Sequence, residues 1–220
     1  MSSVALGRAS WRHPELAAAG VAAGAWTVLA GHSLQSHPWP EPYLAALSGW
    51  VVMAVAMMVP GALADVRRVA LASMWHRRQR TIAIFLASYL CAWIAFGVVA
   101  LALTGWTGLG VGVALVLAAA WELSPQKWRA VRRCHLVEAL PPRGLQADAA
   151  CGRAGLRYGW RCIVACWPLM LAMAAAGHQA LALMALLTAI VAAEKIVVRS
   201  ARLRVPAAAV LAAAALLSAA

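Results

Sequence analysis

The sequence predicts an all-α, polytopic transmembrane helical bundle of about seven helices, and three observations support this. Of the 220 residues, 64% are hydrophobic and only 12% are charged, whereas soluble domains have about 45–50% and about 25%. Long apolar runs alternate with polar connections. All 19 lysines and arginines fall in every second connection. A water-soluble fold would need more polar surface, and a disordered chain would be less hydrophobic.

Seven apolar segments mark the expected helices, because about 20 residues are needed to cross a hydrocarbon core of about 30 Å. In chain order they cover residues 15–34, 43–64, 81–103, 108–125, 158–177, 180–198 and 205–219. The fourth and seventh are the shortest. Backbone groups in lipid must be satisfied within their own segment, so each segment is expected to be helical.

The positions of the cationic side chains predict the orientation of the chain. They lie before residue 15, at 67–80, at 127–161 and at 195–204. By the positive-inside rule these connections face the cytoplasm, which puts the N-terminus inside and the C-terminus outside.

This partition defines the expected domain organisation. Residues 1–14 form a cytoplasmic tail, and residues 15–219 form one transmembrane domain with a basic cytoplasmic loop at 126–157. An alternative remains for the first apolar segment: Arg8 and Arg12 followed by an apolar run are also typical of a signal peptide. Cleavage would leave the other six helices unchanged.

The net charge of +12 does not indicate a nucleic-acid binder, because such a protein carries its basic residues as a patch on a polar domain. The expected environment is a lipid bilayer. Five scattered cysteines do not form the framework of a small disulfide-rich protein. No P-loop, dinucleotide fingerprint, nucleophile elbow or zinc-protease helix is present, so we identify no catalytic residue and expect no enzyme.

The fifth segment carries the clearest chemical pattern. Cys162, Cys166, Met170 and Met173 are spaced four, four and three residues apart, which puts their sulfurs on one helical face. Thiolates and thioethers are soft ligands suited to Cu(I), and thiolates also suit Zn(II). The alternative is ordinary packing, in which methionine fills gaps and cysteine acts as a small hydrophobe.

The second segment has a similar sulfur pattern. Met53, Met57 and Met58 share a face and are followed by Pro60. Pro60, like Pro168 in the fifth segment, removes one helical hydrogen bond and so frees a carbonyl oxygen near the sulfurs.

Ionisable residues lie at the expected cytoplasmic ends of the helices, where burial would be costly. Glu194 and Lys195 follow a long apolar run. Two interpretations remain open. In the first, Glu194 is a metal ligand or a proton relay at the cytoplasmic end of the bundle. In the second, Glu194 pairs with a nearby arginine while Lys195 extends to the interface.

Several of these motifs resemble a bacterial family of predicted metal-binding integral membrane proteins, catalogued as a domain of unknown function. The stretch from Trp50 to Pro60 is similar to its W-x-x-M-x-x-A-M-M-x-P motif, and Cys166 to Met170 is similar to its C-W-x-L-M motif. Further similar pieces follow in order at 89–93, 121–127, 155–170 and 194–195. The resemblance covers roughly residues 43–200 and implies a location in the bacterial inner membrane.

Two departures from the family pattern concern its cysteines. Ala130 stands where the family has the first cysteine of K-x-x-C-L-x-x-C-R, and Ala165 stands in place of a cysteine of G-C-C-W. Cys134, Cys162 and Cys166 match the positions that remain.

We therefore expect a membrane protein that binds a soft metal ion, copper above all, for transport or delivery. The expected ligands are Cys162, Cys166, Met170, Met53, Met57 and Met58, with Cys134 and Glu194 nearer the cytoplasmic exit. Two other functions remain open: a non-catalytic membrane subunit that assists a soluble partner protein, and a membrane thiol–disulfide oxidoreductase, since cysteines at i and i+4 lie within disulfide range.

Overall fold

The computed structural model describes residues 13–35, 42–134, 144–177, 180–196 and 203–218. In these residues the chain forms α-helices and one short 3-10 helix and no strand, which confirms the all-α prediction. The elements are α2 (Leu16–Gln35), α3 (Pro42–Ala72), η1 (Trp75–Arg77), α4 (Arg78–Thr107), α5 (Val111–Glu122), α6 (Pro125–Cys134), α7 (Gly144–Ala176), α8 (Leu181–Ile196) and α9 (Arg204–Leu217).

Four stretches are long and apolar enough to cross a membrane. They are Leu16–Ser33, Ala46–Ala72, Trp75–Thr107 and Gly144–Ala176. The apolar helices α5 and α9 are shorter than a full crossing requires. A membrane location is consistent with these helices, and the expected count of seven crossings stays a prediction.

The helices extend beyond the apolar segments on the side rich in arginine. α7 begins at Gly144 and runs for 33 residues, whereas its apolar part begins only near residue 158. Apolarity marks the part of a helix that is buried or in lipid, and alanine, glutamine, leucine and arginine continue the helix equally well in a polar region.

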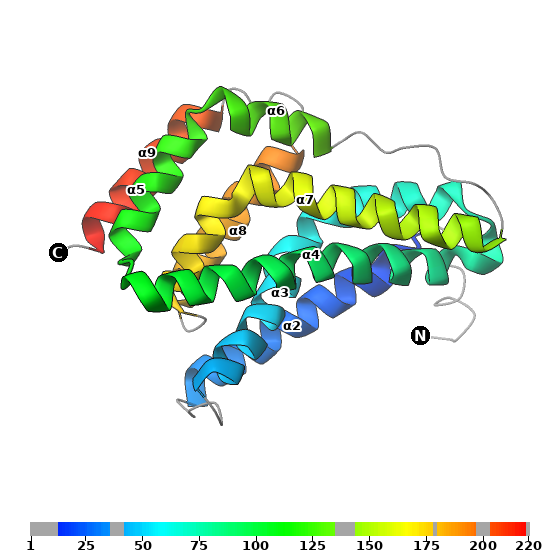
Figure 1. Cartoon of the computed structure of the whole chain (residues 1–220), viewed down its shortest axis with the longest axis horizontal. Helices are drawn as coiled ribbons and strands as arrows, with labels where there is room; N and C mark the ends of the chain where they lie inside the picture. The colour runs from blue at the N-terminus through cyan, green and yellow to red at the C-terminus, as the bar shows by residue number, and fades with distance from the viewer. Residues whose placement is uncertain (1–12, 36–41, 135–143, 178–179, 197–202, 219–220) are drawn as a thin grey trace.

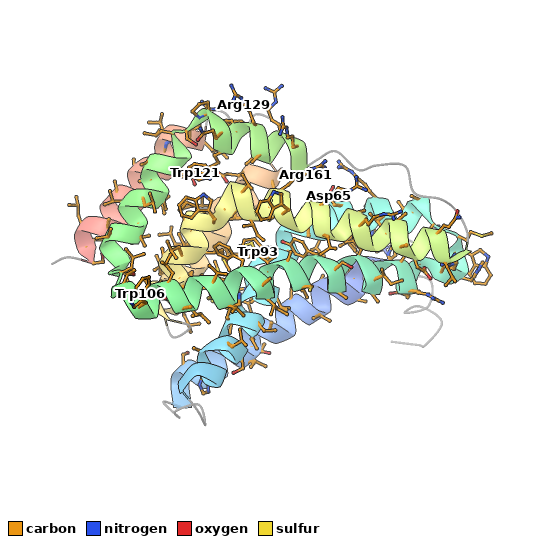
Figure 2. The ribbon with its side chains drawn as sticks, in the orientation of Figure 1. Asp65, Trp93, Trp106, Trp121, Arg129 and Arg161 are labelled. Carbon is orange, nitrogen blue, oxygen red and sulfur yellow. The ribbon has the colours of Figure 1, made fainter. Side chains whose placement is uncertain are left out.

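α6 occupies part of the connection that the sequence suggested was a loop. Its start has a local cause: Ser124 Oγ accepts a hydrogen bond from the Lys127 backbone N–H at 3.2 Å, and Pro125 occupies the first helical position. Both are typical of a helix N-terminus. The helix is amphipathic, so Lys127 is buried while Arg129 on its outer side is exposed (Figure 2).

The centre of the fold is the pair α4 and α7, which lie side by side and run in the same direction (Figure 1). Cys151 Sγ donates to the Thr81 carbonyl oxygen at 3.3 Å. One turn further along both helices, Gly155 faces the Phe85 carbonyl, and after another turn Gly159 faces Tyr89. Because these glycines have no side chain, the two backbones approach closely.

α3 packs against the other side of α4 through tryptophan. The Trp50 indole Nε1 donates to the Trp93 carbonyl oxygen at 2.9 Å, and the ring lies over Gly97. α2 joins α3 in a related way, because Trp26 Nε1 donates to the Ala56 carbonyl oxygen at 3.0 Å. Residue 56 is four before Pro60, so Trp26 satisfies the carbonyl that the proline frees.

The remaining helices surround this centre. α5 and α9 lie side by side at one edge, and α6 connects that edge to α7 (Figure 1). α8 contacts α3 and α7. The largest buried side chains include methionines from α3, α7 and α8, so the interior is rich in sulfur.

Gly155→Ala is expected to destabilise the fold by about 1–3 kcal/mol, the usual cost of overpacking a core. A Cβ at this position would meet the backbone carbonyl of Phe85, which cannot move without shifting α4. Thermal unfolding of the purified protein in detergent measures the effect. Gly105→Ala is the matched control, since no atom lies within 4 Å of its Cβ position; equal melting temperatures for the two variants would contradict close packing at Gly155.

Candidate functional site

Cys162 and Cys166 are brought together on α7. Both are buried, with exposures of 0% and 1%. Each thiol lies one helical turn from the other, on the same face of α7. They are free thiols and not a disulfide. The pair is therefore available as two adjacent sulfur ligands enclosed by the bundle.

Polar side chains from two other helices converge on Cys162. Lys195 Nζ of α8 donates to Cys162 Sγ at 3.2 Å and to the Tyr158 hydroxyl at 3.3 Å. The Tyr89 hydroxyl of α4 lies 3.5 Å from the same sulfur. Lysine and tyrosine usually keep their polar atoms in water, so their convergence on a buried sulfur marks this place as more than hydrophobic core.

The methionine-rich turn of α3 lies beside these groups. Tyr89 donates to the Met58 carbonyl oxygen at 3.2 Å, and Tyr158 donates to the Gly61 carbonyl oxygen at 3.4 Å. The side chains of Met53, Met57 and Met58 are all buried. This stretch of α3 thus lies at the level of Cys162.

Further along α7, Met170 and Met173 are fully buried. Their spacing from Cys166 keeps them on the face that carries the thiols. Both sulfur stripes of the sequence therefore point into the protein interior and not outward to the surroundings.

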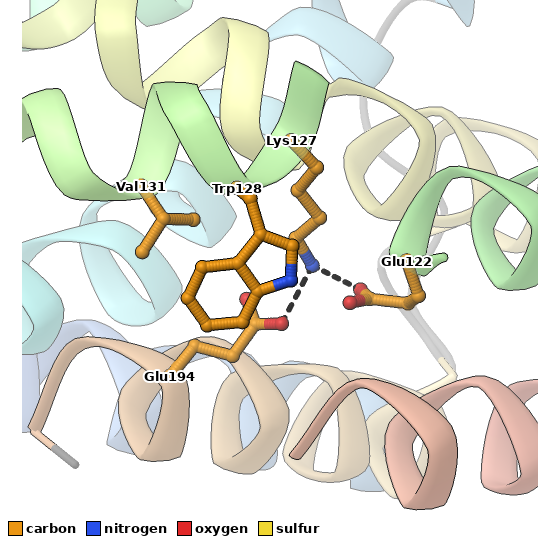
Figure 3. Close-up of a pocket in the computed structure, with 5 residues that line it drawn as sticks. All are labelled: Glu122, Lys127, Trp128, Val131 and Glu194. Atoms are coloured by element: carbon orange, nitrogen blue, oxygen red, sulfur yellow. Dashed lines mark hydrogen bonds and ion pairs between the residues drawn. The ribbon is translucent and has the colours of Figure 1, made fainter. Parts of the chain in front are cut away.

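A charged cluster joins α5, α6 and α8. The ammonium of Lys127 lies between two carboxylates: it is hydrogen-bonded to Glu122 Oε1 and lies 2.7 Å from Glu194 Oε1 (Figure 3). All three residues are buried. Together with Trp128 and Val131 they line a small pocket.

The surrounding acidic side chains keep Lys127 protonated. Burial lowers the pKa of Lys127, but the neighbouring Glu194 and Glu122 raise it by more, so the pKa lies above its ordinary value. The lysine therefore stays protonated.

The thiol pair and the charged cluster are adjacent because Glu194 and Lys195 are consecutive residues of α8. Glu194 extends to Lys127, and Lys195 extends to Cys162. This corrects one interpretation of the sequence: the partner of Glu194 is a buried lysine and not an arginine, and Lys195 turns inward instead of extending to the interface. The reason is that neighbouring helix residues differ in direction by about 100°, which sends one side chain to each site.

The structure does not bring every expected ligand to the thiol pair. Glu194 belongs to the cluster with Lys127. Cys134 ends α6, and its side chain lies outside the described residues. Within the described part of the chain, no three histidine, cysteine or acidic side chains are grouped as a metal site. Two thiols are fewer than the four protein ligands of a structural zinc site or the three of a catalytic one.

Sequence reasoning did not single out Tyr89, Tyr158 or Lys127 as parts of a site. Tyr89 and Lys127 lie in pieces that resemble the family, but a tyrosine or lysine near the end of an apolar segment usually indicates only a membrane interface. The positions at which family cysteines are replaced, Ala130 and Ala165, are both buried.

Comparison with known proteins finds one family. The family model described as PpoB2, copper chaperone, matches residues 47–218, which is more than half of the chain. No curated protein and no solved structure gave a significant match. The matched region contains both thiols and the complete charged cluster.

Lys127→Met is expected to cost about 3–5 kcal/mol of stability, because it leaves the buried Glu122 and Glu194 side chains without their common cation. Thermal or denaturant unfolding in detergent measures the loss. Arg80→Ala is the control: its ion pair with Asp148 is 2.7 Å long, but the arginine is 62% exposed and such pairs contribute less than about 1 kcal/mol. Similar stability of both variants would show that the cluster does not hold α5, α6 and α8 together.

Proposed function

The chain belongs to this copper chaperone family, and we propose that it is an integral membrane protein that holds Cu(I) at Cys162 and Cys166 and delivers it to a soluble partner protein. Copper is the cargo in this proposal and not a resident cofactor. The observation that carries it is the pair of buried thiols on adjacent turns of α7, with Lys195 Nζ and the Tyr89 hydroxyl at the Cys162 sulfur.

The chemistry of these ligands supports copper over harder ions. Thiolates and thioethers are soft donors that select Cu(I), whereas magnesium and calcium require oxygen ligands. A site enclosed by the bundle also keeps the ion away from water. Met58 and Met170 are the thioether candidates: the backbone carbonyl of Met58 accepts from Tyr89, and Met170 lies one turn beyond Cys166 on α7.

The surface of the fold supports the membrane location in this proposal. The exposed surfaces of α2, α4, α5 and α9 include large apolar side chains, which a lipid environment accommodates. The arginines of η1, α4 and α6 lie at helix ends, while Trp106, near the opposite end of α4, is 89% exposed (Figure 2). This distribution supports the orientation with the basic connections in the cytoplasm.

In this proposal the charged cluster lies on the route between the thiols and the cytoplasm. Lys127 lines the pocket with Glu122 and Glu194, and Glu194 is the sequence neighbour of Lys195, which contacts Cys162. The pocket has room for about one water molecule or ion. In this proposal copper passes this pocket when it leaves the bundle, and the amphipathic α6 is the surface that a partner protein contacts.

The proposal predicts that the purified protein, loaded with Cu(I) under reducing conditions, retains copper after desalting, and that Cys162→Ala/Cys166→Ala does not. Elemental analysis against protein concentration gives the stoichiometry. Cys91→Ala/Cys151→Ala is the matched control, because it also removes two free thiols from α4 and α7. Equal copper in all three proteins, or none in the wild type, would contradict the proposed site.

Met170→Leu and Met58→Leu are each expected to weaken Cu(I) binding by roughly tenfold while costing less than about 1.5 kcal/mol of stability, since the swap nearly conserves volume and removes only the soft donor. Competition with a chelator of known affinity measures the binding. Met184→Leu, at a fully buried methionine of α8, is the control. If all three variants bind like the wild type, the copper ligands are the thiols alone.

A further inference from the structure

Lys195 has an unusual set of partners for a lysine inside a protein. Its ammonium contacts the Cys162 sulfur and the Tyr158 hydroxyl and lies 5.2 Å from the Tyr158 ring centroid. In the part of the chain that the structure describes, no aspartate or glutamate forms an ion pair with it. Lys195 is half-buried, and a cation drawn away from water is normally matched by an anion; among the described residues, this one has no carboxylate counterpart.

The neighbouring acidic residues are already engaged elsewhere. Glu194 and Glu122 both bind Lys127, which forms a separate cluster of one cation and two carboxylates. The groups that contact Lys195 Nζ directly are the Cys162 sulfur and the Tyr158 hydroxyl. Of these two, the thiol is the one that becomes an anion when it binds a metal ion.

The position of Lys195 is fixed by the helix opposite. Gly61 of α3 leaves space for the lysine side chain: a Cβ there would lie 2.9 Å from Lys195 Cδ and 3.3 Å from Nζ. Tyr158, which accepts from Lys195, donates in turn to the Gly61 carbonyl oxygen. The glycine and the tyrosine together direct the ammonium at the sulfur.

We propose that Lys195 is the counter-charge of a two-thiolate complex and that it makes the site specific for a soft monovalent cation, Cu(I), over divalent ions. This rests on the proposed function. Binding forms two copper–sulfur bonds, each protonated thiol releases its proton to the buffer, and no electron is transferred. Two thiolates with Cu(I) carry one net negative charge, which Lys195 cancels. Two thiolates with Zn(II) are neutral, so Lys195 would leave an uncancelled positive charge.

The burial of Cys162 determines how strongly the charge of Lys195 acts on the metal complex. Cys162 is 0% exposed, and charges about 4 Å apart interact far more strongly in such a place than in bulk water. An uncancelled charge in the complex is correspondingly costly. The same ammonium therefore stabilises one complex and opposes the other.

The test measures the affinities of the full-length protein in detergent for Cu(I) and for Zn(II), each by competition with a chelator. Lys195→Met is expected to lower the ratio of Cu(I) to Zn(II) affinity by roughly tenfold or more. Lys195→Arg keeps the charge and is expected to restore most of the ratio. Tyr158→Phe keeps every charge but removes one of the contacts that direct the ammonium, and its ratio is expected to fall by less than that of Lys195→Met.

Gly61→Ala provides a second variant that retains the lysine. Its Cβ pushes the flexible Lys195 side chain away from the sulfur, so the ratio is expected to fall by less than in Lys195→Met. If Lys195→Met does not fold, Gly61→Ala decides, and an unchanged ratio overturns the inference.

The inference and the proposed function fail in different ways. A wild type that binds no Cu(I), or binds it without Cys162 and Cys166, contradicts the proposed function. A wild type that binds Cu(I) through both thiols, together with a Lys195→Met variant of unchanged ratio, contradicts only the role of Lys195.

Discussion

The close approach of α4 and α7 is the constraint on which the rest of the structure depends. At Gly155 and Gly159 the side of α7 is reduced to backbone, and the carbonyl groups of α4 lie where a side chain would otherwise be. Helices in contact at this distance have a fixed register, since a shift by one residue would put a side chain against the Phe85 carbonyl. That register places the Tyr89 hydroxyl at the Cys162 sulfur.

Buried charge then determines how the shorter helices attach to this pair. α8 ends with one residue directed at each of two sites: Glu194 reaches Lys127 and Lys195 reaches Cys162. A buried charge without a partner is costly. A displacement of α8 would break both of these interactions at once. The stability of this region and the geometry of the thiols are thus linked through the same turn of helix.

Much of this protein could be read from composition and spacing. The all-α class follows from apolar runs that are too long and too continuous for a soluble fold, and both sulfur stripes, on α3 and on α7, face the interior as their helical spacing predicted. The family resemblance seen in the motifs agrees with a copper chaperone model over residues 47–218. The helix ends were less predictable, because α6 and the first turns of α7 are polar and apolarity alone does not mark them.

The sequence by itself determined the helices and which face of each carries sulfur, because these depend on side-chain type and on a repeat of 3.6 residues within one segment. Only the tertiary structure decided that Lys195 points at Cys162, that Glu194 pairs with Lys127, and that Tyr89 and Tyr158 complete the site. These contacts join residues up to 73 positions apart. Their partners are chosen by the register between helices, which depends on how glycines and large side chains interlock and is not encoded in any one segment.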